Sequence, residues 1–285
     1  MTSGLDWSGK VGDVWAAEWR RTDRSFADLS RHLNAAIAAV APQRGLALDI
    51  GSGAGATSLA LHAARPGLRV LGVDLSPELV AVAQERAADE GGGTDEAPLR
   101  FCCDDAIQLA AREGPFDLFV SRHGVMFFPD PVAAFRGLRQ AATDDAAFVF
   151  SCFDARGHNG FATIADAVIG HTPSTPAGYE PGPFAFADSH RVADWLEQAG
   201  WTPGAAARIS FDYVVGAGGD PVADAVAFLS RIGPAARAIA TAAADERSRI
   251  VEALGRALAD YQVEDRVVLP ASAWIWRAHA RGDAG

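Results

Sequence analysis

The sequence predicts an α/β protein with a doubly wound, largely parallel sheet. Three observations lead to this fold class. Five short apolar segments alternate with helical patterns, as strands and helices do in βαβ units. The segment FDLFVS at 116–121 is almost continuously apolar, which is typical of a strand buried on both faces of a parallel sheet. The glycine cluster GSGAG at 51–55 follows the first apolar segment, where a strand–helix turn can approach a ligand closely.

Each element follows from a local pattern. Spaced apolar side chains over 11–40 predict amphipathic helices before the sheet begins. Pro77 predicts the first turn of the helix after the second strand, because proline is tolerated there. The five strands are expected at 46–50, 68–74, 99–103, 116–121 and 146–153. The later elements are expected as a helix at 189–199, a strand at 206–215, helices at 221–232 and 235–260, and a last strand at 272–280.

This order predicts one α/β domain in three parts. Residues 1–45 form an N-terminal helical cover, and residues 46–153 form the α/β core. Residues 154–285 supply a lid, inserted helices and the final strands of the same domain. The alternation breaks at 154–188, which is rich in proline, glycine and aromatic residues. Long connections of this kind in compact domains are often functional lids.

Composition excludes several classes of partner. The 285-residue chain has a formal net charge of −11 and no Lys/Arg-rich run, so neither nucleic acid nor an anionic membrane is an expected partner. Cys102, Cys103 and Cys152 fit neither a disulfide framework nor the ligand spacing of a zinc site, so reduced cysteines and no metal are expected. The polar start and the lack of an apolar run of roughly 20 residues indicate a cytoplasmic protein.

The glycine loop predicts a nucleotide-type ligand at the first strand–helix turn. Glycines let the backbone approach a ligand, and the helix N-terminus offers unpaired N–H groups. Asp74 ends the second strand, 23 positions after Gly51, where a carboxylate can accept both hydroxyls of a ribose. The same GSGAGA also satisfies the dinucleotide pattern G-x-G-x-x-G/A. An NAD-dependent oxidoreductase is therefore one alternative.

Three features favour a different cofactor. Asp49 lies two residues before Gly51, and a carboxylate there suits an ammonium group better than a pyrophosphate. Asp104 and Asp105 follow the third strand, where an acid can accept from an adenine amino group. The segment FDLFVSRHGVMFF ends the fourth strand at the switch point where sheets of this kind bind ligands.

These motifs together carry a family resemblance. The pattern D-x-G-x-G-x-G, then VLGVDLSPELVAVAQERA, an acid–Ala pair and FDLFVSRHGVMFFPDPVAAFRGL resembles the class I S-adenosylmethionine-dependent methyltransferases. It is similar to their small-molecule branch, which includes ubiquinone/menaquinone-type methyltransferases. The resemblance implies a Rossmann-like, seven-stranded sheet whose last strand is antiparallel. One departure is ATDDAA at 142–147, where the family usually has a Pro-Gly-Gly turn before the fifth strand.

The resemblance also implies a set of cofactor contacts. The methionine portion would be held by Asp49 and the backbone of Gly51, Ser52 and Gly53, with Ser121 near the same end. Asp74 would bind the ribose and Leu75 would lie against the adenine. Asp105 and Ala106 match the acid–Ala pair beside the adenine, and Asp104 is a second candidate.

On the acceptor side, His123 is a candidate general base, with a pocket-lining or structural role as the alternative. His158 is a second candidate base or substrate contact. Arg122 either steers an acidic substrate group or pairs with a nearby aspartate. For the aromatic residues, core packing is the alternative to a role at the site. Phe127, Phe128, Phe184 and Phe186 are candidates to line an apolar acceptor pocket, and Trp15 and Trp19 to cover the cofactor.

The sequence therefore predicts an S-adenosylmethionine-dependent methyltransferase that transfers a methyl group to a small, partly apolar molecule by in-line displacement. An NAD-dependent oxidoreductase is one alternative, and a non-catalytic or repurposed S-adenosylmethionine-binding protein is the other. O-, N- and C-methylation require no distinct residues visible in the sequence.

Overall fold

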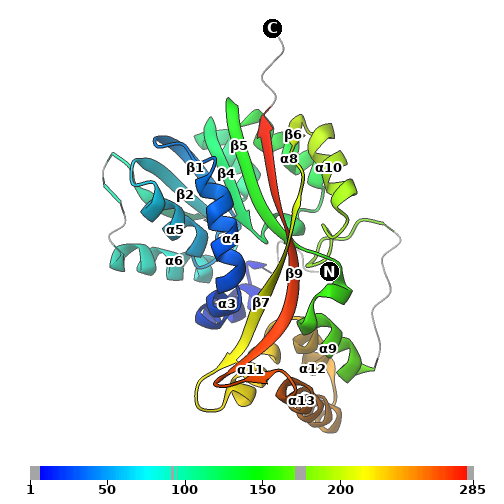
Figure 1. Ribbon diagram of the computed structural model, residues 1–285. Helices are drawn as coiled ribbons and strands as arrows, with labels where there is room; N and C mark the ends of the chain where they lie inside the picture. The colour runs from blue at the N-terminus through cyan, green and yellow to red at the C-terminus, as the bar shows by residue number, and fades with distance from the viewer. Residues whose placement is uncertain (1–6, 91–92, 95, 171–177, 281–285) are drawn as a thin grey trace.

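The computed structural model describes residues 7–90, 93–94, 96–170 and 178–280. These residues form one mixed sheet flanked by helices, in the order β3-β2-β1-β4-β5-β9-β6, and both β7 and β8 also pair with β9 (Figure 1). Strands β1 to β5 are parallel, and β9 runs antiparallel to β5. The strands are β1 (Gly45–Ile50), β2 (Leu68–Asp74), β3 (Leu99–Cys103), β4 (Phe116–Arg122), β5 (Ala142–Phe153), β6 (Trp201–Pro203), β7 (Ala207–Ala217), β8 (Gln262–Val263) and β9 (Arg266–Ala280).

The Rossmann-like α/β class and the antiparallel last strand are confirmed. The number of strands is corrected, because the described residues form a nine-stranded sheet instead of a seven-stranded one. The seven strands of the main order are present, and the two additional strands, β7 and β8, both pair with β9.

Helices cover both faces of this sheet. They are α2 (Lys10–Ala17), α3 (Trp19–Ser25), α4 (Ala27–Ala38), α5 (Ala56–Ala64), α6 (Pro77–Asp89), α7 (Ala106–Glu113), α8 (Pro131–Gln140), α9 (Gly160–Ile169), α10 (Ser189–Gln198), α11 (Pro221–Leu229), α12 (Pro234–Thr241) and α13 (Ala244–Ala259), with short 3-10 turns η1 (Val125–Phe127) and η2 (Arg156–His158). Polar caps begin several of them. Ser76 accepts a hydrogen bond from the Leu79 N–H at the start of α6, and Pro77 takes the first helical position as predicted.

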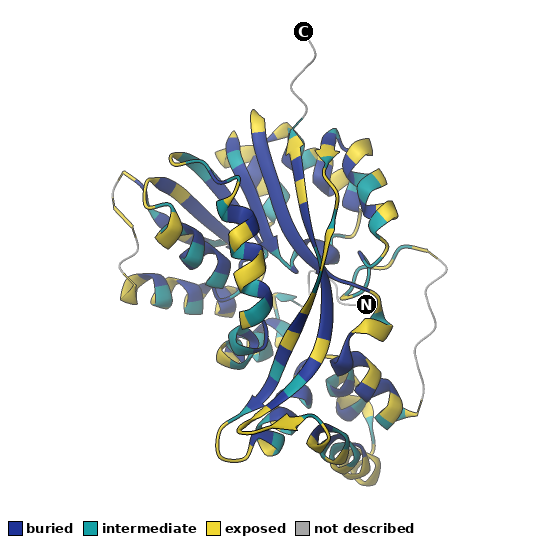
Figure 2. Ribbon diagram, in the orientation of Figure 1, coloured by how far each residue is buried: buried dark blue, intermediate teal, exposed yellow. Residues whose placement is uncertain are grey.

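The centre of the sheet is strongly aromatic. Phe116, Phe119, Phe148 and Phe150 on β4 and β5 are completely buried, as the dark strands of Figure 2 show. This burial on both faces explains the near-continuous apolar pattern of these strands. Trp201 is also fully buried, and its indole N–H donates to the Phe135 carbonyl at 2.8 Å. That anchor helps to explain how the three-residue strand β6, which local sequence patterns did not predict, holds its place beside β9.

The N-terminal helices and the long antiparallel pair of strands β7 and β9 frame the core. Helix α4 lies across the face of β4 and β5 (Figure 1). Its own side chains Leu29, Leu33 and Ile37 are buried. Strands β7 and β9 pair over most of their length and project beyond the end of β5. Helices α9, α11, α12 and α13 pack around the part of this strand pair that extends beyond β5.

Three predicted boundaries are corrected. The last strand begins at Arg266 instead of 272, because β7 provides it with a partner as far as Ala217. The segment 235–260 forms two helices, since Ala242 and Ala243 both adopt extended backbone. The ATDDAA segment belongs to β5 and is not a turn, because Ala142 already pairs with Phe116, with an irregularity in register before Leu118.

None of the helices in the described part of the chain combines the length and the apolar character needed to cross a membrane.

Candidate functional site

The candidate site lies at the carboxyl ends of β1, β2 and β4, where the predicted cofactor residues converge. The glycine loop after β1 has a left-handed backbone at Gly51 (φ 64°) and Gly53 (φ 54°), which favours glycine. A Cβ on Gly51 would lie 2.9 Å from the Cα of Gly124, so this glycine allows the loop to pass close to the segment that follows β4. A Cβ on Gly53 would have no described protein atom within 4 Å. The backbone there faces open space.

Asp49 is a buried carboxylate at the end of β1. Its side chain is 1% exposed, and its Oδ2 accepts a hydrogen bond from the Ser58 hydroxyl at 2.6 Å. Its Oδ1 is buried and has no hydrogen-bond partner among the described residues. Burial raises the pKa of Asp49 to about 7, against the opposing effects of the Ser58 hydrogen bond and the charge of Arg122. Ser58 therefore holds the carboxylate in position, and one of its two oxygens lacks a hydrogen-bond partner among the described residues.

Asp74 links the end of β2 to the glycine loop. Its Oδ2 accepts from the Gly53 N–H at 2.8 Å, and its Oδ1 accepts from the Ser76 N–H at 2.9 Å. Burial raises the pKa of this carboxyl, and the two backbone hydrogen bonds act in the opposite direction. The next residue, Leu75, leaves 37% of its surface exposed although it is a large apolar side chain. An apolar surface therefore lies next to a positioned carboxylate.

The acidic residues after β3 differ in their partners. Asp105 caps α7 through Oδ1, which accepts from the N–H groups of Ile107 and Gln108 at 3.0 and 2.9 Å. Its capping geometry involves one carboxylate oxygen, and Ala106 follows as the first residue of the helix. Asp104 is paired with Arg112 at 2.7 Å. The cap explains locally why the acid–Ala pair begins a helix at this edge of the sheet.

Ser121 and His123 occupy the end of β4. Ser121 is fully buried, and its hydroxyl donates to the Ile50 carbonyl at 2.7 Å while accepting from the Gly124 N–H at 3.1 Å. It therefore joins the end of β4 to the end of β1. His123 has a left-handed backbone (φ 64°), which is uncommon for a residue other than glycine.

The His123 imidazole is enclosed by aromatic rings. The ring centroids of Phe26 and Phe153 lie 5.0 and 4.2 Å from its own. Its Nδ1 is 2.9 Å from the Ser151 hydroxyl, whereas its buried Nε2 has no partner within the described residues. Burial, followed by the charge of Arg122, lowers the pKa of His123 to about 3. The imidazole is therefore neutral over the ordinary pH range and a weak proton acceptor.

Arg122 pairs with an aspartate, one of its two predicted alternatives. Its Nη2 donates to the Asp23 carboxylate at 3.0 Å and its Nη1 to the Ser30 hydroxyl at 3.2 Å. Asp23 also pairs with Arg86 at 3.0 Å, and Arg86 donates to the carbonyl of Ala54 in the glycine loop at 2.6 Å. Sequence analysis missed Asp23 and Arg86, because no local pattern signals a contact between segments this far apart in the chain.

The predicted tryptophans lie over this loop. Trp15 and Trp19 pack with Ala54 of the glycine loop and Leu79 of α6. The guanidinium of Arg86 lies 4.3 Å from the centre of the Trp19 ring. Trp7 contacts Phe127 edge-on, with ring centroids 5.0 Å apart. The N-terminal segment therefore covers the carboxyl edge of the sheet from the β2 side to the β4 side.

The four candidate phenylalanines separate into different environments. Phe186 is completely buried beside Phe135 and Phe150, so it packs in the core. Phe127 and Phe184 are only partly buried. Phe128 is also partly buried, and its carbonyl accepts from the Tyr179 hydroxyl at 2.5 Å.

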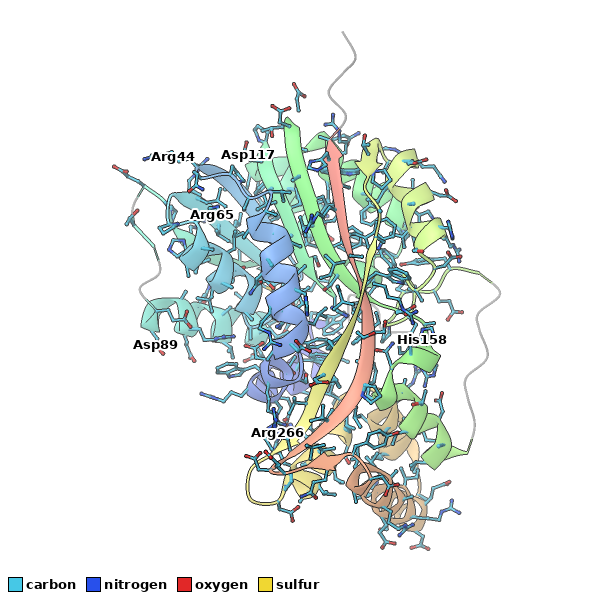
Figure 3. All side chains as sticks on the ribbon, in the orientation of Figure 1. Arg44, Arg65, Asp89, Asp117, His158 and Arg266 are labelled. Atoms are coloured by element: carbon cyan, nitrogen blue, oxygen red, sulfur yellow. The ribbon has the colours of Figure 1, made fainter. Side chains whose placement is uncertain are left out.

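His158 is on η2, beside the middle of β9, and half of its side chain is exposed (Figure 3). Its Nδ1 lies 2.9 Å from the Asp154 carboxylate. The described residues contain no cluster of side chains able to hold a metal ion.

Comparison with known proteins identifies the core. Residues 48–150 match the family model described as a methyltransferase domain. Over these residues the chain is similar to a methyltransferase domain. The predicted resemblance to class I S-adenosylmethionine-dependent methyltransferases is confirmed for this segment, and S-adenosylmethionine is the methyl donor that its family indicates.

Curated relatives match parts of the chain. An uncharacterized protein of Mycobacterium tuberculosis is 38% identical over 87 residues, covering 30% of this chain and 29% of the relative. A demethylmenaquinone methyltransferase of Thermus thermophilus is 33% identical over 90 residues, covering 32% and 38%. A malonyl-[acyl-carrier protein] O-methyltransferase of Magnetococcus marinus is 29% identical over 173 residues, covering 61% and 57%. In each case the chain spans less than two thirds of the relative's length.

Solved structures share the fold of this methyltransferase domain and its additions. The YcgJ protein from Bacillus subtilis has a TM-score of 0.54 at 17% identity, covering 88% of this chain and 99% of that one. The [4+2]-cyclase SpnF has a TM-score of 0.51 at 17% identity, covering 87% and 80%. Because SpnF is named as a cyclase, the fold alone does not define the reaction, and the residues of the site have to carry that argument.

Proposed function

We propose that this protein is an S-adenosylmethionine-dependent methyltransferase that transfers a methyl group to a small, partly apolar molecule. The observation that carries the proposal is Asp49, a buried carboxylate with one unsatisfied oxygen beside a glycine loop. An ammonium group is the partner that such an oxygen lacks, and the methionine portion of the cofactor carries one. A pyrophosphate would instead be repelled by this carboxylate, which argues against NAD.

The other residues of the site are compatible with the rest of the cofactor. The open backbone at Gly53 leaves room for the methionine portion. Asp74 would accept from the ribose hydroxyls, and its two backbone hydrogen bonds hold it in position. The exposed Leu75 side chain would lie against the adenine, where contact removes apolar surface from water.

When bound, S-adenosylmethionine supplies a methyl group on a sulfonium that is already activated. The protein's task is then to align the acceptor and exclude water, and alignment can lower a barrier by up to roughly 7–11 kcal/mol. The covering helices α2 and α3, with Trp15 and Trp19 packed over the glycine loop, support water exclusion. The partly buried Phe127 and Phe184 support an apolar environment for the acceptor.

His123 is better suited to shaping the site than to removing a proton. A base is most effective when its pKa is near the working pH, and burial lowers the pKa of His123 to about 3. We therefore assign His123 as a neutral residue of the active-site floor, held by Ser151. The acceptor would be a nucleophile that needs no deprotonation by this histidine.

Gly53→Ala is expected to weaken the binding of S-adenosylhomocysteine about tenfold or more. The new Cβ meets no described protein atom, so it would occupy space proposed for the ligand. The left-handed backbone adds about 1 kcal/mol of strain. Gly170→Ala is the matched control, because Gly170 also has a left-handed backbone (φ 84°) and open surroundings. Calorimetry should show weaker binding of S-adenosylhomocysteine by Gly53→Ala and unchanged binding by Gly170→Ala, which carries the same kind of backbone strain. Equal affinities of the two variants would contradict the assignment of Gly53.

The proposed function is tested by binding and by turnover. Calorimetry should show saturable binding of S-adenosylhomocysteine, and a fluorescence titration with NADH should show none. A release assay for S-adenosylhomocysteine over a panel of small acceptors should then identify turnover. Binding without turnover of any acceptor in a broad panel would favour a non-catalytic or repurposed protein, and binding of NADH alone would refute the proposal.

A further inference from the structure

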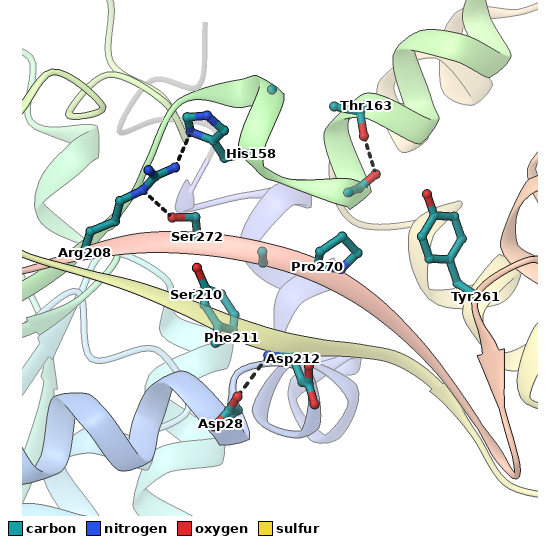
Figure 4. Close-up of a pocket in the computed structure, with 13 residues that line it drawn as sticks. Asp28, His158, Thr163, Arg208, Ser210, Phe211, Asp212, Tyr261, Pro270 and Ser272 are labelled. Carbon is teal, nitrogen blue, oxygen red and sulfur yellow. Dashed lines mark hydrogen bonds between the residues drawn. The ribbon is translucent and has the colours of Figure 1, made fainter.

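A cavity lies beside the paired strands β7 and β9. It has a volume of about 540 Å³, and its lining includes His158, Arg208, Ser210, Asp212 and Tyr261 (Figure 4). The ring of Phe211 also lines it and lies 6.4 Å from Phe26, which in turn contacts His123. A layer of aromatic rings therefore separates this cavity from the cofactor site.

A buried carboxylate, Asp154, holds one of the residues that line the cavity, Arg208. Asp154 is 4% exposed, and its Oδ2 accepts from the Ser272 hydroxyl at 3.0 Å and from Arg208 Nε at 2.6 Å. The hydrogen bonds of Ala155 and Ser272 and the charge of Arg208 lower the pKa of Asp154, outweighing the opposing effect of burial. An ionised carboxylate thus fixes the position of the arginine at the edge of the cavity.

The contacts of His158 are mutually incompatible. Its Nδ1 lies 2.9 Å from Asp154 Oδ2 and 2.8 Å from Arg208 Nη2. A protonated Nδ1 can donate to the carboxylate but then faces another donor on the arginine. An unprotonated Nδ1 can accept from the arginine but then faces the carboxylate. One of the two contacts is therefore unfavourable in every protonation state, and it is relieved if Arg208 Nη2 turns to a different acceptor.

We propose that this cavity binds a small, hydrophilic acid through a compact oxyanion group, either a carboxylate or a phosphate. The oxyanion would accept from Arg208, whose Nη1 makes none of the hydrogen bonds described for the protein and whose side chain is 47% exposed. Guanidinium groups bind such oxyanions through paired N–H donors. Ser210 and Tyr261 add hydroxyl groups to the lining, which also carries the carboxylates of Asp28 and Asp212. Asp28 already has partners, since its Oδ1 pairs with Arg31 and its Oδ2 accepts from the Asp212 N–H at 2.9 Å. Binding would leave His158 Nδ1 to donate to Asp154 alone.

The site is tested by nuclear magnetic resonance of the histidine side chains, with succinate and inorganic phosphate as probes. His158→Asn identifies the His158 signals. Succinate, phosphate or both should shift these signals in a saturable manner, with the largest change at Nδ1, where the contact with Arg208 is lost. Arg208→Gln should weaken this binding at least tenfold. Arg266→Gln is the matched control, since Arg266 is an exposed arginine at the first position of β9, does not line the cavity and should leave binding unchanged (Figure 3).

Two further arms make the result decisive. Succinamide has the shape of succinate without its charge, so equal binding of the two would overturn the proposal. Arg208→Lys keeps the charge that Asp154 requires but lacks the planar pair of donors, so it should bind the anion at least threefold more weakly than the unmodified protein. It replaces Arg208→Gln as the test if that variant is too unstable to assay. No saturable shift with either anion would refute the site. These measurements use no methyl donor, so they are independent of the proposed methyltransferase activity.

Discussion

Asp49→Asn is expected to weaken the binding of S-adenosylhomocysteine about 100-fold while making the free protein more stable. Removing one partner of a buried charged hydrogen bond costs roughly 2–5 kcal/mol of binding energy. Without ligand, however, the ionised carboxylate opposes folding. Burial raises its pKa from 3.8 to about 7, which corresponds to an unfavourable contribution on the order of 4 kcal/mol above pH 7. An amide keeps the shape and removes the charge.

Calorimetry and urea denaturation at pH 8 measure the two effects on the same variant. The free energy of unfolding should rise by about 2 kcal/mol, because the new amide still leaves a buried polar group unsatisfied. Asp117→Asn is the matched control. Asp117 lies on β4 at the opposite edge of the sheet, where its Oδ2 accepts from the Leu46 N–H at 2.8 Å (Figure 3). The Asp117→Asn variant should be less stable than the unmodified protein but should bind S-adenosylhomocysteine with the same affinity. If Asp49→Asn destabilised the free protein, the burial argument would be wrong.

In the unmodified protein, His123 and Asp49 are expected to change the free energy of unfolding with pH in opposite directions, so that the two effects nearly cancel. Removing either side chain should reveal the effect of the other. The pKa of His123 is lowered to about 3, so the unfolded state binds the additional proton below pH 6.5 and stability falls as the pH falls. The pKa of Asp49 is raised to about 7, so the folded state holds the additional proton between pH 3.8 and 7 and stability falls as the pH rises. Each group changes the free energy of unfolding by about 1.4 kcal/mol per pH unit within its range.

The measurement is the difference in free energy of unfolding between each variant and the unmodified protein, from pH 4 to pH 7. For Asp49→Asn, this difference should grow as the pH rises. For His123→Asn, it should grow as the pH falls, and asparagine tolerates the left-handed backbone at this position. Parallel slopes for the two site variants would contradict the assigned environments.

The two effects have one structural origin. The carboxyl ends of β1 and β4 are enclosed by aromatic and apolar residues, so polar groups placed there lose water without gaining full sets of partners. Asp49 Oδ1 and His123 Nε2 both lack a partner among the described residues. A site of this kind is less stable than an apolar core of the same shape, and the charged ligand proposed above would supply a partner that the site lacks.

Local patterns were sufficient to predict the strands of the core, the Pro77 helix start and the positions of Asp49, Gly51, Gly53 and Asp74 at the carboxyl ends of the first two strands. These features depend on residues close together in the chain: an apolar run, a turn that needs glycine and a carboxylate at a strand end. Strand β6 and the full length of β9 were not predictable in this way. Trp201 is held by Phe135, and β9 is extended by its pairing with β7, and both contacts join distant segments.

The sequence by itself determined the class of sheet, the position of the glycine loop and the residue types offered to a cofactor, because backbone conformation and hydrophobic periodicity are local properties. Only the tertiary structure decided what His123 and Arg122 do. His123 is neutral because Phe26 and Phe153, from the turn between α3 and α4 and from β5, enclose it. Arg122 is occupied by Asp23, 99 residues earlier in the chain. Protonation and pairing depend on burial and on nearby charge, which arise only when distant segments meet.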